Sequence, residues 1–243
     1  MNILLIDIGN TRIKWGLAED GSWLRQGWAL TAQPAELGKA LTALPLPDRI
    51  LIANVAGASA QTKVAAVLPA TAQPACWLIS AAQQCGVRSS YVDPAALGPD
   101  RWAALIGAWH LTGSACVVVN AGTTMTVDAL NGEGVFLGGC IVPGAALMRD
   151  ALARDTANLA QRAGAFSYFP DNTGDAIFSG TVNALSGAVA QVVQYLQQSS
   201  GTAPRVLLSG GDASLIEARI NGTVTVVDNL VLEGLLQIAQ QAD

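Results

Sequence analysis

The chain has 243 residues, of which 51% are hydrophobic and only 13% are charged, and its formal net charge is −5. That length is enough for one large domain or two modest ones with an ample core. The acidic balance and the lack of any run of basic residues argue against nonspecific nucleic-acid binding, which depends on clustered Lys and Arg.

The first predicted elements are two strands, residues 3–6 and 14–17, in the segment LLIDIGNTRIKWGL. Between them an acid, a glycine, an amide and a hydroxyl follow one another from Asp7 to Thr11. One interpretation is a plain β-hairpin, because Asn-Gly type turns dominate hairpins. The other is an anion site, since glycine lets successive backbone N–H groups point into one concavity. Lys14 could then offset phosphate charge, and Asp7 could hold Mg²⁺ through water.

Strands and helices alternate through the rest of the first half, which indicates an α/β architecture. The predicted helices cover residues 35–44, 62–68 and 101–111, and the predicted strands cover residues 50–56 and 76–80.

No membrane-spanning segment or signal peptide is expected. The stretch between Arg101 and Asp128 carries no formal charge and is long enough to span a bilayer. Polar residues divide it, so we predict a buried helix followed by a core strand. The N-terminus lacks a basic region, and Asp7 interrupts its apolar run.

The second half repeats the opening pattern. The segment CVVVNAGTTMTVDAL again combines a strand, a polar turn and a strand, and Asn120 to Thr124 aligns with Asp7 to Thr11 at an offset of 113 (120 minus 7). We therefore predict two related α/β lobes, residues 1–113 and residues 114–243. Further predicted elements are a long helix over 182–198, a strand with a glycine turn over 205–213 and a closing helix over 230–241.

Two matching turns favour an anion site over two unrelated hairpins. One turn from each lobe could hold a polyphosphate between them, although the Walker pattern G-x-x-x-x-G-K-[ST] is absent. The glycine clusters at 137–144 and 209–213 read as turns that end strands, and their small residues would suit the wall of a nucleotide site.

Asp100 and Arg101 stand at the start of the uncharged helix. Asp100 could be no more than a helix cap, since Asp is favoured there. Arg101 would be costly without a partner, and a carboxylate ligand would satisfy it. His110 is expected in the core, and the four cysteines are expected to be free thiols because they show no metal or disulfide spacing.

The segments DIGNTRIKWGL, YVDPAALGPDR, NAGTTMTVDAL, GGCIVPG and GGDA follow one another as in type III pantothenate kinases. The chain resembles that family over nearly its whole length. The family belongs to the acetate and sugar kinase, Hsc70 and actin superfamily, and the chain also resembles the related Bvg accessory factor proteins. The resemblance implies an α/β fold of two duplicated ribonuclease H-like lobes, the actin-type ATPase fold, with a mixed sheet in each.

The resemblance also implies roles for single residues. Asp100 would be the catalytic proton acceptor for the primary hydroxyl of the substrate. The residues implied to contact ATP are Asp7, Ile8, Gly9, Asn10, Thr11, Arg12, Ile13, Lys14 and Thr123. The residues implied to contact pantothenate are Tyr91, Gly98, Pro99, Asp100, Arg101 and Thr173.

Two metal sites are implied. Asp7 would hold Mg²⁺ through water. Asn120 stands where the family usually has Asp, at the position associated with a monovalent cation, K⁺ or NH₄⁺. An amide can coordinate a cation but brings no charge, so we predict weaker potassium stimulation than in relatives with Asp.

The function implied is ATP-dependent phosphorylation of pantothenate to 4'-phosphopantothenate, the first step of coenzyme A biosynthesis, by a cytoplasmic homodimer. Three alternatives stay open at this point. They are a kinase for another small hydroxyl compound, a phosphatase, and a non-enzymatic regulator of the Bvg accessory type on the same scaffold.

Overall fold

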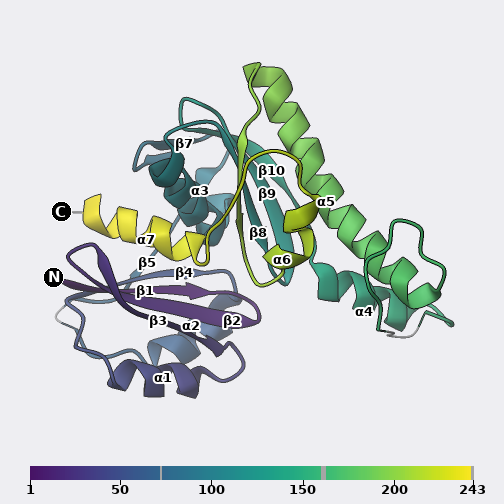
Figure 1. The fold of residues 1–243 in the computed structure, drawn as a ribbon. Coiled ribbons are helices and arrows are strands. Elements are labelled where there is room, and N and C mark those ends of the chain that lie inside the picture. The colour runs from purple at the N-terminus through teal and green to yellow at the C-terminus, as the bar shows by residue number, and fades with distance from the viewer. Residues whose placement is uncertain (72, 160–162, 242–243) are drawn as a thin grey trace. The chain divides into compact units, whose positions relative to one another are not determined.

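The computed structural model describes residues 1–71, 73–159 and 163–241 (Figure 1). The chain divides into two units. Unit 1 comprises Met1–Gly113 and Asn229–Asp243, and unit 2 comprises Ser114–Asp228. Each unit has its own mixed sheet and its own hydrophobic core.

The sheet of unit 1 has the strand order β3-β2-β1-β4-β5. Its strands are β1 (Asn2–Ile8), β2 (Arg12–Glu19), β3 (Ser22–Leu30), β4 (Arg49–Asn54) and β5 (Cys76–Trp77). The first three strands are antiparallel, whereas β4 runs parallel to β1 and β5 runs parallel to β4. The predicted hairpin at the N-terminus is therefore confirmed.

Helices and short strands complete unit 1. They are α1 (Pro34–Thr42), α2 (Gly57–Ala65), β6 (Gln83–Gln84), β7 (Val87–Ser89), the 3-10 turn η1 (Pro94–Ala96), α3 (Pro99–Thr112) and α7 (Leu230–Gln241). Leu37 and Leu41, one turn apart on α1, pack into the same core as Ile6 and Trp15 of the sheet.

The closing helix α7 lies against α3, although it comes last in the chain. Two glycines allow this close approach. A Cβ at Gly234 would overlap the carbonyl of Ala103, and one at Gly107 would lie 2.7 Å from the carbonyl oxygen of Leu230. The expected lobe of residues 114–243 thus differs from unit 2 at its C-terminal end, because the apolar face of α7 is buried in unit 1.

Within unit 2, the strands of the second sheet follow the order β12-β11-β8-β9-β10. Its elements are β8 (Cys116–Ala121), β9 (Thr124–Leu130), β10 (Val135–Pro143), α4 (Ala145–Asp155), α5 (Thr173–Ser200), β11 (Arg205–Ser209), α6 (Ala213–Ile216), η2 (Glu217–Arg219) and β12 (Val224–Val226). β9 runs antiparallel to its two neighbours, β8 and β10. β11 runs parallel to both β8 and β12.

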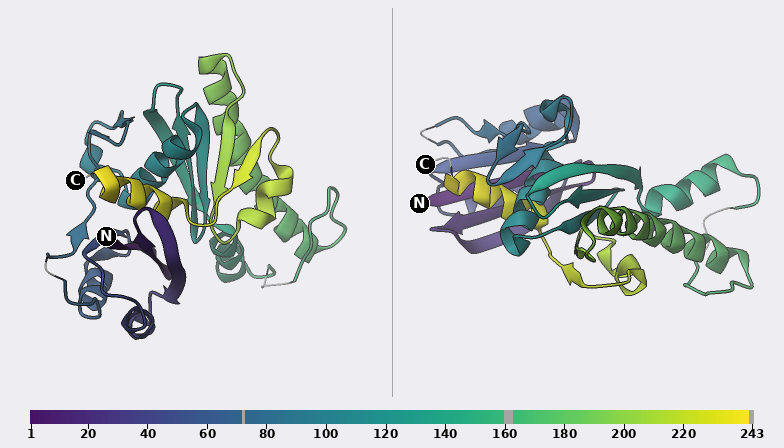
Figure 2. Two further views of the ribbon diagram at one scale, coloured as in Figure 1. Left: turned by 60° about the vertical axis from the view of Figure 1, so that its left-hand side comes forward. Right: turned by 90° about the horizontal axis from the view of Figure 1, so that it is seen from above.

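Helix α5 runs beside this sheet and continues past it next to α4 (Figure 2). Among the described helices it is the one long and apolar enough to cross a membrane. Leu185, Val189 and Leu196 lie on one stripe of the helix and pack into the core of unit 2 with Val117 and Val119 of β8. That stripe accounts for much of its apolar character.

Several elements depart from the sequence predictions. β3 was not predicted, because its side chains are mostly exposed and only Ala29 is buried. Residues 137–144, predicted as a glycine turn, belong mainly to β10, where Gly139 packs directly against Asp128 of the neighbouring strand. α2 begins earlier than the predicted helix over 62–68, and β5 keeps only two residues of the predicted strand over 76–80.

Candidate active site

The first polar turn joins β1 to β2. The backbone N–H of Gly9 donates to the carbonyl oxygen of Arg12 at 3.0 Å, which closes the turn. Asn10 and Thr11 are exposed at its tip. Ile8 and Ile13 flank the turn with fully buried side chains, so only their backbone groups could meet a ligand.

Asp7 is the buried acid of this turn. It pairs with Lys14 across the β1–β2 ladder, which places both side chains on the same face of the sheet. Asp7 is only 8% exposed. The pKa of Asp7 is raised to about 7, chiefly by burial and also by the negative charge of Asp100, while the charge of Lys14 lowers it. A cation bound beside this carboxylate would therefore stabilise its charged form.

Asp100 lies in the first turn of α3, behind the cap residue Gly98 and Pro99. Its Oδ1 accepts a hydrogen bond from the backbone N–H of Arg101 at 2.8 Å. Burial raises the pKa of Asp100, against the lowering effects of that N–H and of the Arg101 charge. A Cβ at Gly98 would lie 2.7 Å from Oδ1 of Asp100, so the glycine leaves room for the carboxylate.

Arg101 is buried, at 7% exposure, and Tyr91 is its neighbour. Nη1 of Arg101 donates to the hydroxyl oxygen of Tyr91 at 3.2 Å, and the guanidinium carbon lies 5.9 Å from the centre of the Tyr91 ring. The structure thus brings together two of the residues implied to contact pantothenate.

Two residues that the sequence reasoning missed hold this segment in place. The hydroxyl of Ser80, which is buried, donates to the carbonyl of Leu97 at 2.8 Å. The indole N–H of Trp102 donates to Oε1 of Gln84 at 2.9 Å. Both are bonds between residues 17 or 18 positions apart, and no local motif signals them.

The second polar turn joins β8 to β9 in unit 2. The N–H of Gly122 donates to the carbonyl of Thr124 at 3.1 Å, so this turn is closed in a similar way to the first. Asn120 is half-buried at the end of β8, and Thr123 is exposed. Gly210, at a φ of +106°, packs against the backbone of Ala121, so the glycine turn of residues 209–213 lies beside the second polar turn.

Thr173 begins α5. The preceding residue, Asn172, caps the helix by accepting the N–H of Asp175 at 3.0 Å. Gly164 and Gly174 approach so closely that a side chain on either would overlap the backbone of the other segment. Thr173 is half-buried at this junction.

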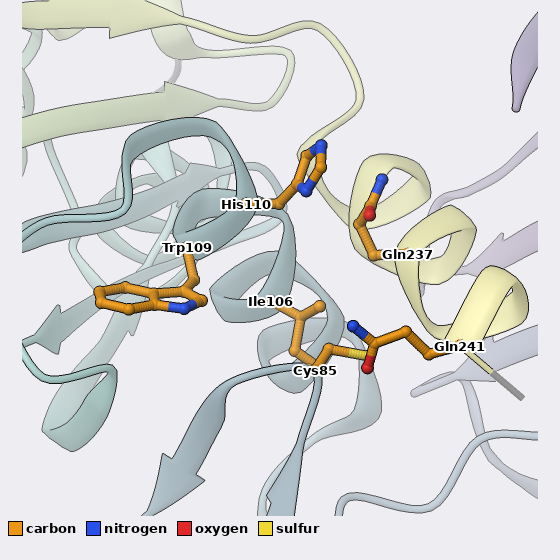
Figure 3. A pocket seen from close by; sticks show the side chains of 6 residues that line it. All are labelled: Cys85, Ile106, Trp109, His110, Gln237 and Gln241. Carbon is orange, nitrogen blue, oxygen red and sulfur yellow. The ribbon is translucent and has the colours of Figure 1, made fainter.

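A separate cavity of about 300 Å³ lies near the C-terminal end of α3, away from the helix start that carries Asp100 (Figure 3). Its lining residues are Cys85, Ile106, Trp109, His110, Gln237 and Gln241. None of the candidate site residues lines it. The expectation of a core His110 is wrong, because this residue is exposed and lines the cavity.

No group of three or more His, Cys, Asp or Glu side chains that could hold a metal occurs among the described residues. Mg²⁺ nevertheless fits Asp7, since this cation usually keeps several waters and binds one or two carboxylates together with substrate phosphates. A buried carboxylate whose protonation is favoured by desolvation is a donor that a cation would stabilise.

Comparisons with known proteins agree with one another. The profile of the family described as type III pantothenate kinase matches residues 3–195. A type III pantothenate kinase from Nitrosospira multiformis is 44% identical over 239 residues, which cover 98% of this chain and 91% of that protein.

Two solved structures share the fold at low identity. A Baf family protein from Campylobacter jejuni superposes with a TM-score of 0.60 and 20% identity, covering 98% of each chain. The activator of the 2-hydroxyisocaproyl-CoA dehydratase from Clostridium difficile superposes with a TM-score of 0.56 and 15% identity, covering 100% of this chain and 94% of that one. The predicted fold, α/β with mixed sheets and of the actin-type ATPase class, is confirmed.

Proposed function

The chain belongs to the type III pantothenate kinase family, and from that premise we propose that Asp100 is the base of its reaction. The enzyme phosphorylates pantothenate in coenzyme A biosynthesis. This function replaces the phosphatase, the regulator and the other kinase that the sequence alone left open. Asp100 accepts the proton of the substrate hydroxyl while that oxygen attacks the terminal phosphorus of ATP.

The observation that carries the proposal is the pair of acids in unit 1. The pKa values of Asp7 and Asp100 are both raised, chiefly by burial, and the charge of Asp100 contributes to the shift at Asp7. Ionising both acids is unfavourable in the protein without ligands, because each carboxylate is buried and the charge of Asp100 acts on Asp7. Acids with strongly perturbed pKa values are typical of functional sites.

The two acids have different tasks in this proposal. Asp7 faces Lys14 at the end of a strand, beside the turn that would receive phosphates. It would hold Mg²⁺ through water, and the bound ion would neutralise charge on the phosphates. Asp100 has a raised pKa, which brings its basicity closer to the working pH, as suits a general base.

Arg101 would position pantothenate, the substrate that receives the phosphoryl group. A guanidinium binds a carboxylate through two parallel hydrogen bonds, and pantothenate carries one carboxylate. The bond from Arg101 to Tyr91 limits the rotation of the guanidinium, so the substrate would meet a group that is already oriented. Phosphoryl transfer depends mainly on such positioning and on charge stabilisation.

Three residues of unit 2 have roles of their own in the proposal. Thr123 would donate to ATP from the second turn, Thr173 would contact pantothenate, and Asn120 would offer a neutral oxygen to a monovalent cation. The Clostridium difficile activator, which shares the fold, was solved with bound ADPNP, and this supports a nucleotide site on the scaffold.

We also propose a cytoplasmic homodimer. Tyr168 and Phe169 of unit 2 expose most of their side chains, and exposed apolar groups of this kind favour association. The four cysteines are free thiols, as in a reducing compartment. Sedimentation at micromolar concentration should give a dimer, and a monomer would contradict this part of the proposal.

The function is tested by mixing the purified protein with ATP, Mg²⁺ and pantothenate and analysing the products by mass spectrometry. We expect 4'-phosphopantothenate and ADP in equal amounts. Other small hydroxyl compounds offered in the same assay should remain unphosphorylated. Transfer to one of them, with pantothenate unchanged, would overturn the assignment.

A further inference from the structure

The first polar turn is fastened from outside by the end of β3. The hydroxyl of Thr31, the residue after β3, donates to the carbonyl oxygen of Gly9 at 2.7 Å. The backbone N–H of the same threonine donates to the carbonyl oxygen of Thr11 at 3.0 Å. One residue, twenty or more positions away in the sequence, therefore holds two carbonyls of the turn.

These two bonds set the direction of the N–H groups that an anion would meet. In a trans peptide the C=O and the following N–H point in opposite directions, and the described chain has no cis peptide bond. Fixing the Gly9 carbonyl toward Thr31 turns the N–H of Asn10 away from β3. Fixing the Thr11 carbonyl does the same for the N–H of Arg12.

A residue of β3 itself, Trp28, contacts the side chain of Arg12. The guanidinium carbon of Arg12 lies 4.7 Å from the centre of a Trp28 ring, within the range of a cation–π interaction. Trp28 is 59% exposed, so burial in the core does not account for its place. In the register of β2 with β3 it stands opposite Lys14, which itself pairs with Asp7.

We propose that Thr31 and Trp28 are positioning residues for the ATP-binding turn. Thr31 preorganises two backbone N–H groups for the phosphates, and Trp28 holds the Arg12 guanidinium beside them. The inference rests on the proposed use of this turn for ATP. It adds two residues outside the family motifs quoted above, and neither needs to touch the nucleotide.

The test is Thr31→Val, which keeps the shape of the side chain and removes its hydroxyl. We expect the KM for ATP to rise about tenfold, the effect of losing one hydrogen bond that organises the site, while the KM for pantothenate stays unchanged. Thr31→Ser, which restores the hydroxyl, should return the KM for ATP to near the wild-type value. Trp28→Leu should raise the KM for ATP about threefold, and Trp28→Phe should raise it less.

Thr42→Val is the matched control, because the hydroxyl of Thr42 donates to the carbonyl of Lys39 within α1, away from the turn. It should change neither KM. Unfolding temperatures measured on all variants show whether each one is folded. A wild-type KM for ATP in Thr31→Val, an equal rise for both substrates, or no rescue by serine would overturn the inference.

Calorimetric titration with ADP separates this inference from the proposed function, since it requires no phosphoryl transfer. Thr31→Val should weaken ADP binding and Thr31→Ser should not. If the wild-type protein binds ADP but leaves pantothenate unphosphorylated, the function fails while the comparison of the Thr31 variants still decides the role of this residue. Equal ADP affinity in Thr31→Val and wild-type protein would refute the positioning role.

Discussion

At the scale of single residues, the site is organised around acids whose negative charge the free protein does not favour. Burial raises the pKa of both Asp7 and Asp100. Each acid lies next to a basic residue, Lys14 for Asp7 and Arg101 for Asp100. The positive charges lower the two pKa values, but by less than burial raises them. Both carboxylates therefore cost the fold stability at neutral pH, and in the proposed mechanism they would serve a cation and a proton.

The first prediction concerns Asp7 and stability. Its pKa rises from an ordinary 3.8 to about 7 on folding, so the protonated form stabilises the fold below about pH 4 and that contribution is lost as the pH rises to about 7. Without Mg²⁺, Asp7→Asn should therefore unfold at a higher temperature than wild type at pH 8, and the difference should shrink toward pH 4.

Thermal unfolding across pH 4 to 8 measures this difference. Glu36→Gln is the control, because it removes the charge of an exposed carboxylate that bonds Lys39 at 2.9 Å. A difference between Asp7→Asn and wild type that is the same at both ends of the pH range would contradict the assigned burial effect.

The second prediction concerns Asn120 and potassium. Asn120 is the penultimate residue of β8 and stands opposite Thr126 and Ser209, and it offers an amide oxygen without charge. Replacing sodium by potassium should change the rate of the wild-type enzyme little. Asn120→Asp should introduce a clear potassium dependence, because a carboxylate attracts the cation more strongly. Kinetics in matched sodium and potassium salts decide the matter, and a steep rise with potassium in the wild type would go against the prediction.

At the scale of elements, the strongest sequence patterns predicted the right structure. The opening hairpin, α3, α5 and α7 are long or strongly apolar segments whose periodicity matches the element formed. β3 was not predicted, because an edge strand with a single buried residue shows no clear alternation of apolar and polar side chains. β10 was not predicted as a strand, because the pair Gly138 and Gly139 is typical of a turn. In the structure Gly139 instead allows close packing against Asp128.

The site was predictable to a similar extent. The motifs around Asp7 and Asp100 named the acids, and the resemblance named Tyr91 and Arg101 as neighbours of the substrate. The electrostatic effect of Asp100 on Asp7 links residues 93 positions apart (100 minus 7), and it arises only once the chain has folded. Thr31 carries no signal in the sequence, because its importance lies in which carbonyls its two donors reach.

The third prediction belongs to the packing of α7 on α3. Gly234→Ala should destabilise the protein by about 1–3 kcal/mol, since the added Cβ overlaps the backbone of Ala103 and the helices must separate. Gly180→Ala on α5 is the matched control. Nothing lies within 4 Å of its added Cβ, so alanine should be neutral or slightly stabilising there. Urea unfolding of both variants measures the effect, and equal stability of the two would refute the tight contact.

At the scale of the whole molecule, the chain folds as two units, and each unit carries a polar turn of the kind predicted from the sequence. Unit 1 supplies the two acids, the first turn and the Arg101–Tyr91 pair. Unit 2 supplies a second turn of similar construction, with a glycine turn packed beside it. The repeat seen in the sequence is thus present as two turns closed by a glycine N–H, which is what duplication of one α/β unit would produce.

The role of Asp100 is the claim on which the mechanism depends, and Asp100→Asn tests it most directly. The amide has almost the same shape but cannot accept the proton, so kcat should fall about 10²- to 10⁴-fold while ADP and pantothenate still bind. Asp93→Asn is the matched control in the same segment, because an asparagine can keep the cap that Asp93 makes with the N–H of Ala95 at 3.0 Å. A folded Asp100→Asn enzyme with near wild-type kcat would remove Asp100 from the reaction.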